Sequence, residues 1–164
     1  TGTPTTAVDA STPLNQAVAG GQSVVAGKYK VTAQNDSYTI TKVRFKVAGT
    51  AATSAVVNSL TVKDGSTILG TVSYDGANDY WELSGLTTLV PANTSKVLTA
   101  EYNLATPYTD GSGSTAPTIV TTGKVATLTM DYVKVSNSQG TETEITTDRV
   151  GNYVYVYKHF LPLP

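Results

Sequence analysis

One stretch of the chain decides its fold class: SYTITKVRFKVAG, residues 37–49. Apolar residues alternate with polar ones at Tyr38 and Ile40, and the alternation then moves by one residue and resumes at Val43 and Phe45. A period-two pattern that changes phase indicates a strand with a β-bulge, or a strand that changes its partner sheet. The positions between the apolar residues after the shift carry basic side chains, namely Lys42, Arg44 and Lys46. One face of this strand is therefore predicted to be buried and the other wet.

Similar segments fill most of the chain. Residues 23–33 are predicted to be a strand that buries Val25, Tyr29, Val31 and Ala33. Residues 96–105 alternate in the same way, with their apolar positions at Leu98, Ala100, Tyr102 and Leu104. Further strands are predicted at 55–64, 66–76, 79–83, 118–137, 141–148 and 153–157. Asp64-Gly65 indicates a hairpin between the first two of these, and 118–137 shows a second phase change near Tyr132-Val133.

Helical periodicity never extends beyond two turns, whereas strands recur about every ten residues with Gly, Asn and Asp turns between them. This spacing predicts an all-β protein, an antiparallel immunoglobulin-like β-sandwich with Greek-key or jelly-roll-like connections. Residues 14–164 are predicted to form one domain with an apolar C-terminal strand. Residues 1–13, rich in Thr, Pro, Ala and Ser, are predicted to be an extended N-terminal arm.

The composition narrows the environment and the partners. The net charge is −1 and only 14% of the residues are charged, so neither nucleic acid nor an acidic membrane surface is an expected partner. The absence of cysteine excludes disulfides and thiolate metal sites. No apolar run reaches the roughly 20 residues of a membrane span. A surface of hydroxyl groups in place of charges is common among secreted β proteins, and we expect an extracellular or cell-surface location.

Catalytic chemistry has little support in the sequence. His159 is the only histidine and lies in the apolar C-terminal segment without a motif around it. We therefore expect no enzyme activity and no cofactor. The acidic segment YDGANDYWE (residues 74–82) leaves two interpretations, a calcium site or a plain hairpin turn, although its spacing does not match an EF-hand loop. Glu142 and Glu144 alternate with Thr and predict a charged edge strand that discourages aggregation.

Two sets of residues are candidates for contact with sugars, one as a binding platform and the other as attachment sites for glycans. Trp81 and Tyr108, together with Tyr74 and Tyr80, are candidates for a platform that stacks on sugar rings; the alternative is that Trp81 belongs to the core and the tyrosines cover sheet faces. Asn35 and Asn93 begin N-x-S/T sequons in predicted turns and are candidate glycosylation sites.

The two ends of the chain are candidates for assembly. The segment YVYVY (153–157) is apolar on both faces, and HFLPLP (159–164) adds an apolar tail, so these residues must cover their own sandwich or dock on a neighbouring copy. The N-terminal arm is either a disordered tail or a strand that joins the sheet of the next subunit. The residues predicted to mediate assembly are Val8, Ala10 and Leu14 in the arm and Tyr155, Tyr157, Phe160 and Leu161 at the C-terminus.

Residues 24–47, VVAGKYKVTAQNDSYTITKVRFKV, resemble the opening strands of immunoglobulin-like domains in prokaryotic surface-layer and extracellular filament proteins. The resemblance covers about a seventh of the chain. It implies a secreted structural β-sandwich, and in the filament members a terminal segment joins subunits by donor-strand complementation. We expect this chain to differ from type IV pilins, because the sequence shows no long apolar N-terminal helix. No sortase sorting signal is seen at the C-terminus either.

The sequence therefore predicts an extracellular structural protein that polymerises with copies of itself, as a filament or surface layer, through a terminal β-strand. The alternative is a carbohydrate-binding or adhesive β-sandwich module of a larger surface protein.

Overall fold

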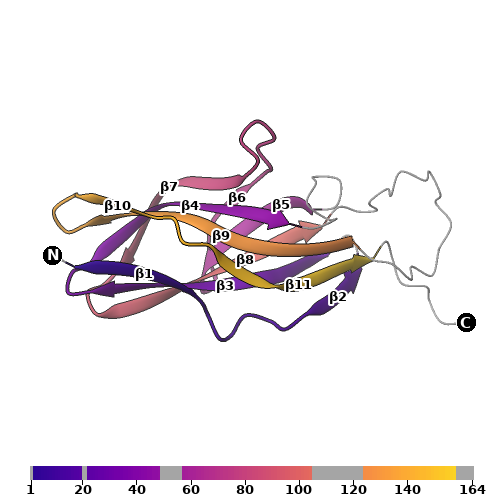
Figure 1. The fold of residues 1–164 in the computed structure, drawn as a ribbon, viewed down its shortest axis with the longest axis horizontal. Coiled ribbons are helices and arrows are strands. Elements are labelled where there is room, and N and C mark those ends of the chain that lie inside the picture. Colours follow the sequence, from indigo (N-terminus) through magenta and orange to yellow (C-terminus); the bar gives the residue numbers. More distant parts are fainter. Residues whose placement is uncertain (1, 20–21, 49–56, 105–123, 158–164) are drawn as a thin grey trace, which may run out of the picture.

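The computed structural model describes residues 2–19, 22–48, 57–104 and 124–157, and within these ranges the chain is all-β (Figure 1). Eleven strands form two sheets in the described residues. The first sheet has the order β1 (Thr3–Val8), β3 (Ser23–Gln34), β8 (Thr94–Leu104), β5 (Val57–Asp64), β6 (Thr67–Val72). The second has the order β2 (Gln16–Ala19), β11 (Arg149–Tyr157), β9 (Lys124–Asn137), β4 (Tyr38–Ala48), β7 (Trp81–Val90), with β10 (Glu142–Ile145) also paired to β9. The predicted β-sandwich is confirmed.

The N-terminal segment contributes to both sheets. β1 runs antiparallel to β3, with Thr3 opposite Gln34 and Val8 opposite Tyr29. Residues 3–8 of the arm predicted at residues 1–13 are therefore an edge strand of this chain's own first sheet. The chain then crosses to the second sheet, where β2 pairs with β11 in the one parallel ladder of the described strands. The sequence analysis assigned no strand to residues 16–19, because a four-residue segment has too few positions to show a period.

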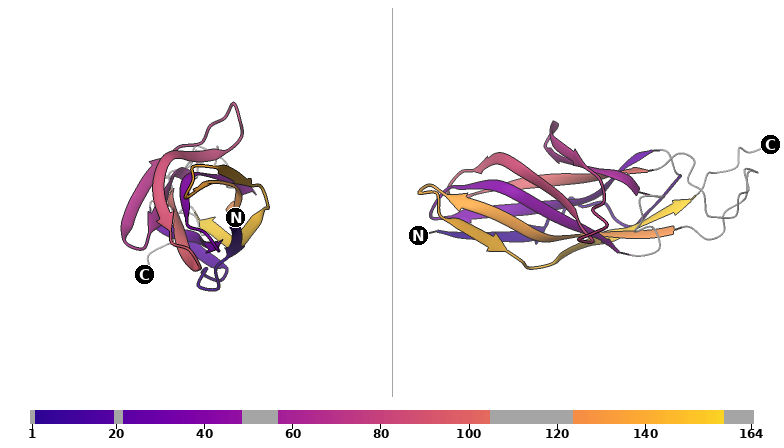
Figure 2. Two further views of the ribbon diagram at one scale, coloured as in Figure 1. Left: turned by 90° about the vertical axis from the view of Figure 1, so that its left-hand side faces the viewer. Right: turned by 90° about the horizontal axis from the view of Figure 1, so that it is seen from above.

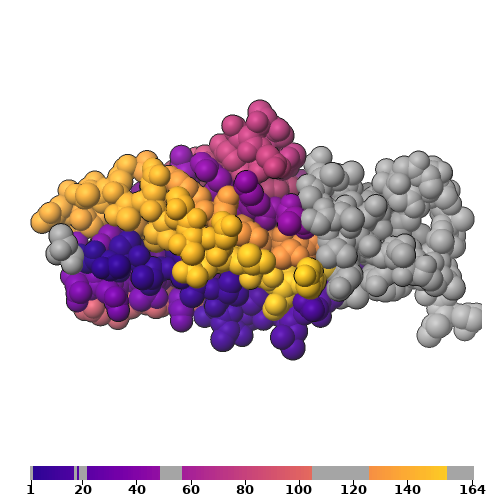
Figure 3. Space-filling model, viewed as in Figure 1, coloured from indigo at the N-terminus to yellow at the C-terminus, as the bar shows by residue number. Residues whose placement is uncertain are grey.

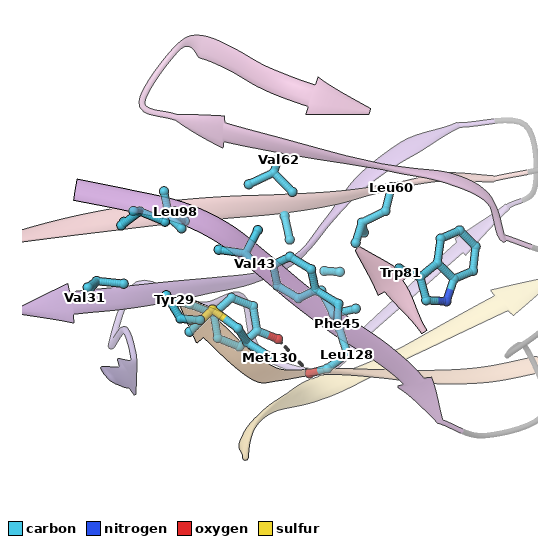
Figure 4. Packing of buried hydrophobic residues seen from close by; sticks show 14 of the residues in the cluster. Tyr29, Val31, Val43, Phe45, Leu60, Val62, Trp81, Leu98, Leu128 and Met130 are labelled. Carbon is cyan, nitrogen blue, oxygen red and sulfur yellow. Dashed lines mark hydrogen bonds between the residues drawn. The ribbon is translucent and has the colours of Figure 1, made fainter. Parts of the chain in front are cut away.

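Apolar residues from both sheets fill the space between them (Figure 4). The alternation predicted in β8 is confirmed, because Leu98, Ala100, Tyr102 and Leu104 are all buried. The prediction for β3 was wrong at Val25, which is only half-buried. The ladder with β8 shifts register between Val25 and Gly27, and this bulge places Ala26 in the core instead.

Bulges explain both phase changes seen in the sequence. In the ladder with β9 the register of β4 shifts between Ile40 and Lys42, so Thr41 is the extra residue there. The ladder with β7 shifts at the same point, but there residues 85–87 of β7 lie opposite Thr41, so the extra residues belong to β7. In β9, Tyr132 lies opposite Arg44 and Met130 opposite Phe45, which leaves Asp131 as the extra residue. The predicted hairpin is also present: β5 and β6 meet at Gly65, whose φ of 60° suits glycine.

A further irregularity lies in β11 and was not predicted. Val150 pairs with Thr129 and Tyr153 with Thr127, so Gly151 and Asn152 of β11 together lie opposite the single residue Leu128 of β9. The hydroxyl of Tyr29, from the first sheet, donates to the Leu128 carbonyl at 2.6 Å (Figure 4). This hydrogen bond joins the two layers inside the core.

The sandwich is elongated, and the ends of its terminal strands lie far apart. β1 begins at one end of the long axis and β11 finishes at the other (Figures 1 and 2). One side of the sandwich is closed by β1 and β11, where Arg149 Nε donates to Thr6 Oγ1 at 3.1 Å. The described residues contain no helix long and apolar enough to cross a membrane.

Candidate functional site

The outer face of the second sheet carries the polar and aromatic residues that the core excludes. The alternation of β4 and β9 points their apolar residues inward, which leaves Arg44 and Tyr132 on the outer face. Glu82 of β7 lies opposite Arg44 and shares this face. Residues from three neighbouring strands therefore meet there.

Arg44 is the centre of a tight cluster on this face. Its Nη2 and Nε donate to Glu82 Oε2 at 2.7 and 3.0 Å. The guanidinium carbon lies 4.3 Å from the ring centroid of Tyr80 and 4.4 Å from that of Tyr132, so one cation contacts two aromatic rings. We call Tyr80, Arg44, Tyr132 and Glu82 the arginine–tyrosine stack. The contacts join both rings to one guanidinium on the surface of the sheet.

Charged residues of β9 and β10 extend this cluster. Lys134 Nζ lies 2.9 Å from Glu142 Oε2, and hydrogen bonding to that carboxylate raises the pKa of Lys134. Burial, together with a hydrogen bond to Glu144, raises the pKa of Tyr132. β10 pairs only with β9 among the described strands, so the prediction of a charged edge strand is confirmed.

The turn between β6 and β7 protrudes beside the stack (Figures 1 and 3). Asp75 Oδ1 accepts from the backbone N–H groups of Ala77 and Asn78 at 3.1 and 3.3 Å, and hydrogen bonding to Asn78 lowers the pKa of Asp75. Tyr74 Oη donates to Asp79 Oδ1 at 2.6 Å. These carboxylates thus accept hydrogen bonds from other residues of the turn. The described residues contain no group of three or more His, Cys, Asp or Glu side chains able to hold a metal ion. The geometry favours the hairpin interpretation of this segment over calcium binding.

A hollow of about 590 Å³ lies farther along the same face. Its lining includes Thr127 and Thr129 of β9, Val150, Asn152 and Tyr153 of β11, and Asn15 from the segment before β2. Figure 3 shows β11 and the N-terminal segment side by side at the surface. The β11 irregularity and the residues on either side of it supply Val150, Asn152 and Tyr153 to this lining.

The sugar platform predicted at Trp81 is not present at that residue. The Trp81 side chain is 1% exposed, and its ring centroid lies 5.5 Å from that of Tyr74 inside the protein. Burial leaves no indole face for a ligand, as the core interpretation stated. Tyr80 does lie on the outer face, within the stack, whereas Tyr108 lies outside the described residues.

The predicted assembly residues fall into two groups. Val8 and Leu14 are 36% and 83% exposed, and Ala10 is also exposed, so this end of the chain presents apolar side chains to solvent. At the C-terminus, Tyr155 and Tyr157 belong to β11, where their backbones pair with β2, but their side chains lie outside the described part. Phe160 and Leu161 lie outside it altogether.

The two predicted glycosylation sites lie next to each other in space. Asn35 and Asn93 are exposed turn residues with φ of 66° and 60°. The backbone N–H of Asn35 donates to Asn93 Oδ1 at 3.0 Å. The two asparagines are 58 positions apart, so the sequence alone did not predict that they lie together.

Arg44, Tyr132, Tyr153 and the two asparagines of the hollow were missed as site residues in the sequence. The available signal was that Arg44 and Tyr132 occupy wet positions of their strands. The register that stacks them, and the irregularity that borders the hollow, depend on pairing between strands distant in sequence.

Comparison with known proteins gives a likeness of fold alone. The sequence matches no protein-family model and no curated protein. A family 123 glycoside hydrolase from Clostridium perfringens aligns with a TM-score of 0.51 at 7% identity, over 98% of this chain and 28% of that one. This chain therefore spans little more than a quarter of that enzyme. A cohesin module of a family 33 glycoside hydrolase from Clostridium perfringens aligns at 8% identity with a TM-score of 0.37, over 95% of this chain and 98% of that one.

Proposed function

We propose that this chain is an extracellular, non-enzymatic β-sandwich module that binds glycans through the outer face of its second sheet. One observation carries the proposal: Tyr80, Tyr132 and Tyr153 come from three separate segments and share this face. Tyrosine combines an apolar ring with a polar tip, which suits a ligand that has both apolar and hydroxyl surfaces. Contact with Arg44 restricts two of the rings before any ligand binds, which lowers the cost of ordering them on binding.

The proposal is tested by screening the purified chain against an oligosaccharide array and measuring the affinity of any hit by calorimetry. Thr129→Arg places a long charged side chain on the proposed face and should abolish binding. Thr5→Arg makes the same change on exposed β1 of the other sheet and should leave binding intact. Absence of glycan binding by the unmodified chain, or equal loss in both variants, contradicts the proposal.

A second function, self-assembly through a terminal strand, is favoured by the positions of β1 and β11. β1 begins at one end of the sandwich and β11 finishes at the other, an arrangement suited to head-to-tail contact between copies (Figure 1). Because β1 already pairs with β3 in its own chain, strand exchange would require β1 to leave its sheet. Electron microscopy of the full chain and of a chain lacking residues 1–13 tests this function. Filaments formed only by the full chain support it, and monomers of both at high concentration exclude it.

A further inference from the structure

The hollow lies beside the irregular part of β11. Gly151 and Asn152 lie opposite the single residue Leu128 in the ladder between β11 and β9, so β11 carries a β-bulge at this point. A Cβ atom on Gly151 would lie 3.1 Å from Tyr29 Oη and 3.2 Å from the Leu128 carbonyl, which shows how closely the irregular segment is packed on its inner side. Its outer side lines the hollow.

We infer that this hollow binds an uncharged sugar ring of a glycan, an inference that rests on the proposed glycan-binding function. The volume of about 590 Å³ falls within the roughly 300–1,000 Å³ of typical small-molecule sites. None of the residues that line it carries a charge. A charged ligand would have to lose water at this site without gaining an opposite charge, whereas a neutral polyol would not.

Two asparagines give the hollow a complementary donor and acceptor. Asn15 Oδ1 accepts from the backbone N–H of Tyr153 at 2.9 Å, which leaves the NH₂ group of Asn15 as a donor. Asn152 Nδ2 donates to the carbonyl of Pro13 at 2.7 Å, which leaves the Asn152 carbonyl as an acceptor. A sugar hydroxyl both donates and accepts, so it can satisfy the two groups together. The bonds to the backbone also hold each amide in one orientation.

Apolar and hydroxyl groups complete the site. The side chains of Val150 and Tyr153 are 57% and 50% exposed, so each offers apolar surface to a ligand. Thr127 and Thr129 add two hydroxyl groups from the sheet itself. A pyranose ring matches this combination, because its C–H surface can pack on the tyrosine ring while its hydroxyls meet the threonines and asparagines.

The test compares neutral hexose disaccharides with uronic-acid and sialylated oligosaccharides, measured by calorimetry on the full chain. We expect binding of a neutral probe that weakens by about tenfold or more in Tyr153→Ala, because this change removes the one aromatic ring of the hollow. Tyr153→Phe keeps the ring and should stay within about twofold of the unmodified chain. Ile68→Ala, which removes an exposed apolar side chain on β6 of the other sheet, is the matched control and should not change affinity.

The outcomes separate this inference from the proposed function. Binding that is lost in Tyr132→Ala but kept in Tyr153→Ala, or that selects acidic probes, overturns the inference and leaves glycan binding by this face intact. Failure of every glycan to bind the unmodified chain overturns both. Fluorescence of buried Trp81 verifies that each variant is folded before its affinity is compared.

Discussion

Two buried tyrosines should respond in opposite ways to loss of their hydroxyl groups. Tyr29 and Tyr102 are both fully buried in the core. The Tyr29 hydroxyl donates to the Leu128 carbonyl at 2.6 Å, whereas the Tyr102 hydroxyl has no hydrogen-bond partner among the described residues. A buried polar group gains stability only when it is bonded, and it costs stability when it is not. The same change, Tyr→Phe, therefore removes a favourable group at one site and an unfavourable one at the other.

The size of each effect follows from these contacts. Tyr29→Phe removes one hydrogen bond and deprives the buried Leu128 carbonyl of its side-chain donor, so the free energy of unfolding should fall by about 2 kcal/mol. With a urea m-value of roughly 2 kcal/mol per molar for a chain of this size, the midpoint moves about 1 M lower. Tyr102→Phe should leave stability unchanged or raise it, because it removes a desolvated hydroxyl.

Urea unfolding followed by the fluorescence of Trp81 measures both variants, because this single tryptophan is 1% exposed and becomes solvated on unfolding. A loss below about 0.5 kcal/mol in Tyr29→Phe would show that the hydrogen bond between the layers contributes little. A loss in Tyr102→Phe as large as that in Tyr29→Phe would refute the reasoning, since it would mean that the Tyr102 hydroxyl is bonded in solution.

Three further outcomes are expected. Burial raises the pKa of Tyr29 and of Tyr102 above the value of about 10 in unfolded chains. Their contribution to the free energy of unfolding is therefore full below that pH and is lost as the pH rises above it. Urea unfolding in alkaline buffers should show this decline, and a constant free energy of unfolding would contradict it. Arg44→Lys keeps the charge but loses the two hydrogen bonds to Glu82 and the contact of the planar guanidinium with two rings. The free energy of unfolding should therefore fall by about 1 kcal/mol. An unchanged urea midpoint would show that the stack does not stabilise the fold. Gly151→Ala places a Cβ atom 3.1 Å from the Tyr29 hydroxyl and 3.2 Å from the Leu128 carbonyl and should lower the melting temperature in calorimetry. The effect should be smaller when Tyr29→Phe is already present, because only the contact with the hydroxyl is then removed.

Strand content was predictable because it depends on neighbouring residues. Alternation in β8 marked its inner face correctly, and the phase change in residues 37–49 marked the bulge at Thr41. β7 shows where such reasoning stops: the strand was predicted at residues 79–83 but runs from Trp81 to Val90, because it resumes after an irregularity between Ser84 and Thr88 that interrupts the period. The pattern at Val25 failed for the same reason, since a bulge changes which residues face inward.

The candidate site was less predictable, because it is made by contacts between distant segments. Trp81 drew attention as the one tryptophan, yet a large apolar ring is stabilised by burial, and the fold places it in the core. Arg44 and Tyr132 looked like ordinary wet positions of two strands. They became a stack only when the ladder between β4 and β9 placed one opposite the other.

The sequence by itself determined that this chain is an all-β sandwich with a hydroxyl-rich surface, because side-chain alternation and turn residues act over a few positions. Only the tertiary structure decided which solvent-exposed residues contact one another. Asn15 and Tyr153 are 138 positions apart and join because β2 pairs with β11. The hollow lies at the bulge of β11 against β9, and that bulge depends on pairing with a strand distant in sequence. Pairing between remote strands is a property of the whole packed chain, so a site built from it becomes visible only once the sheets are assembled.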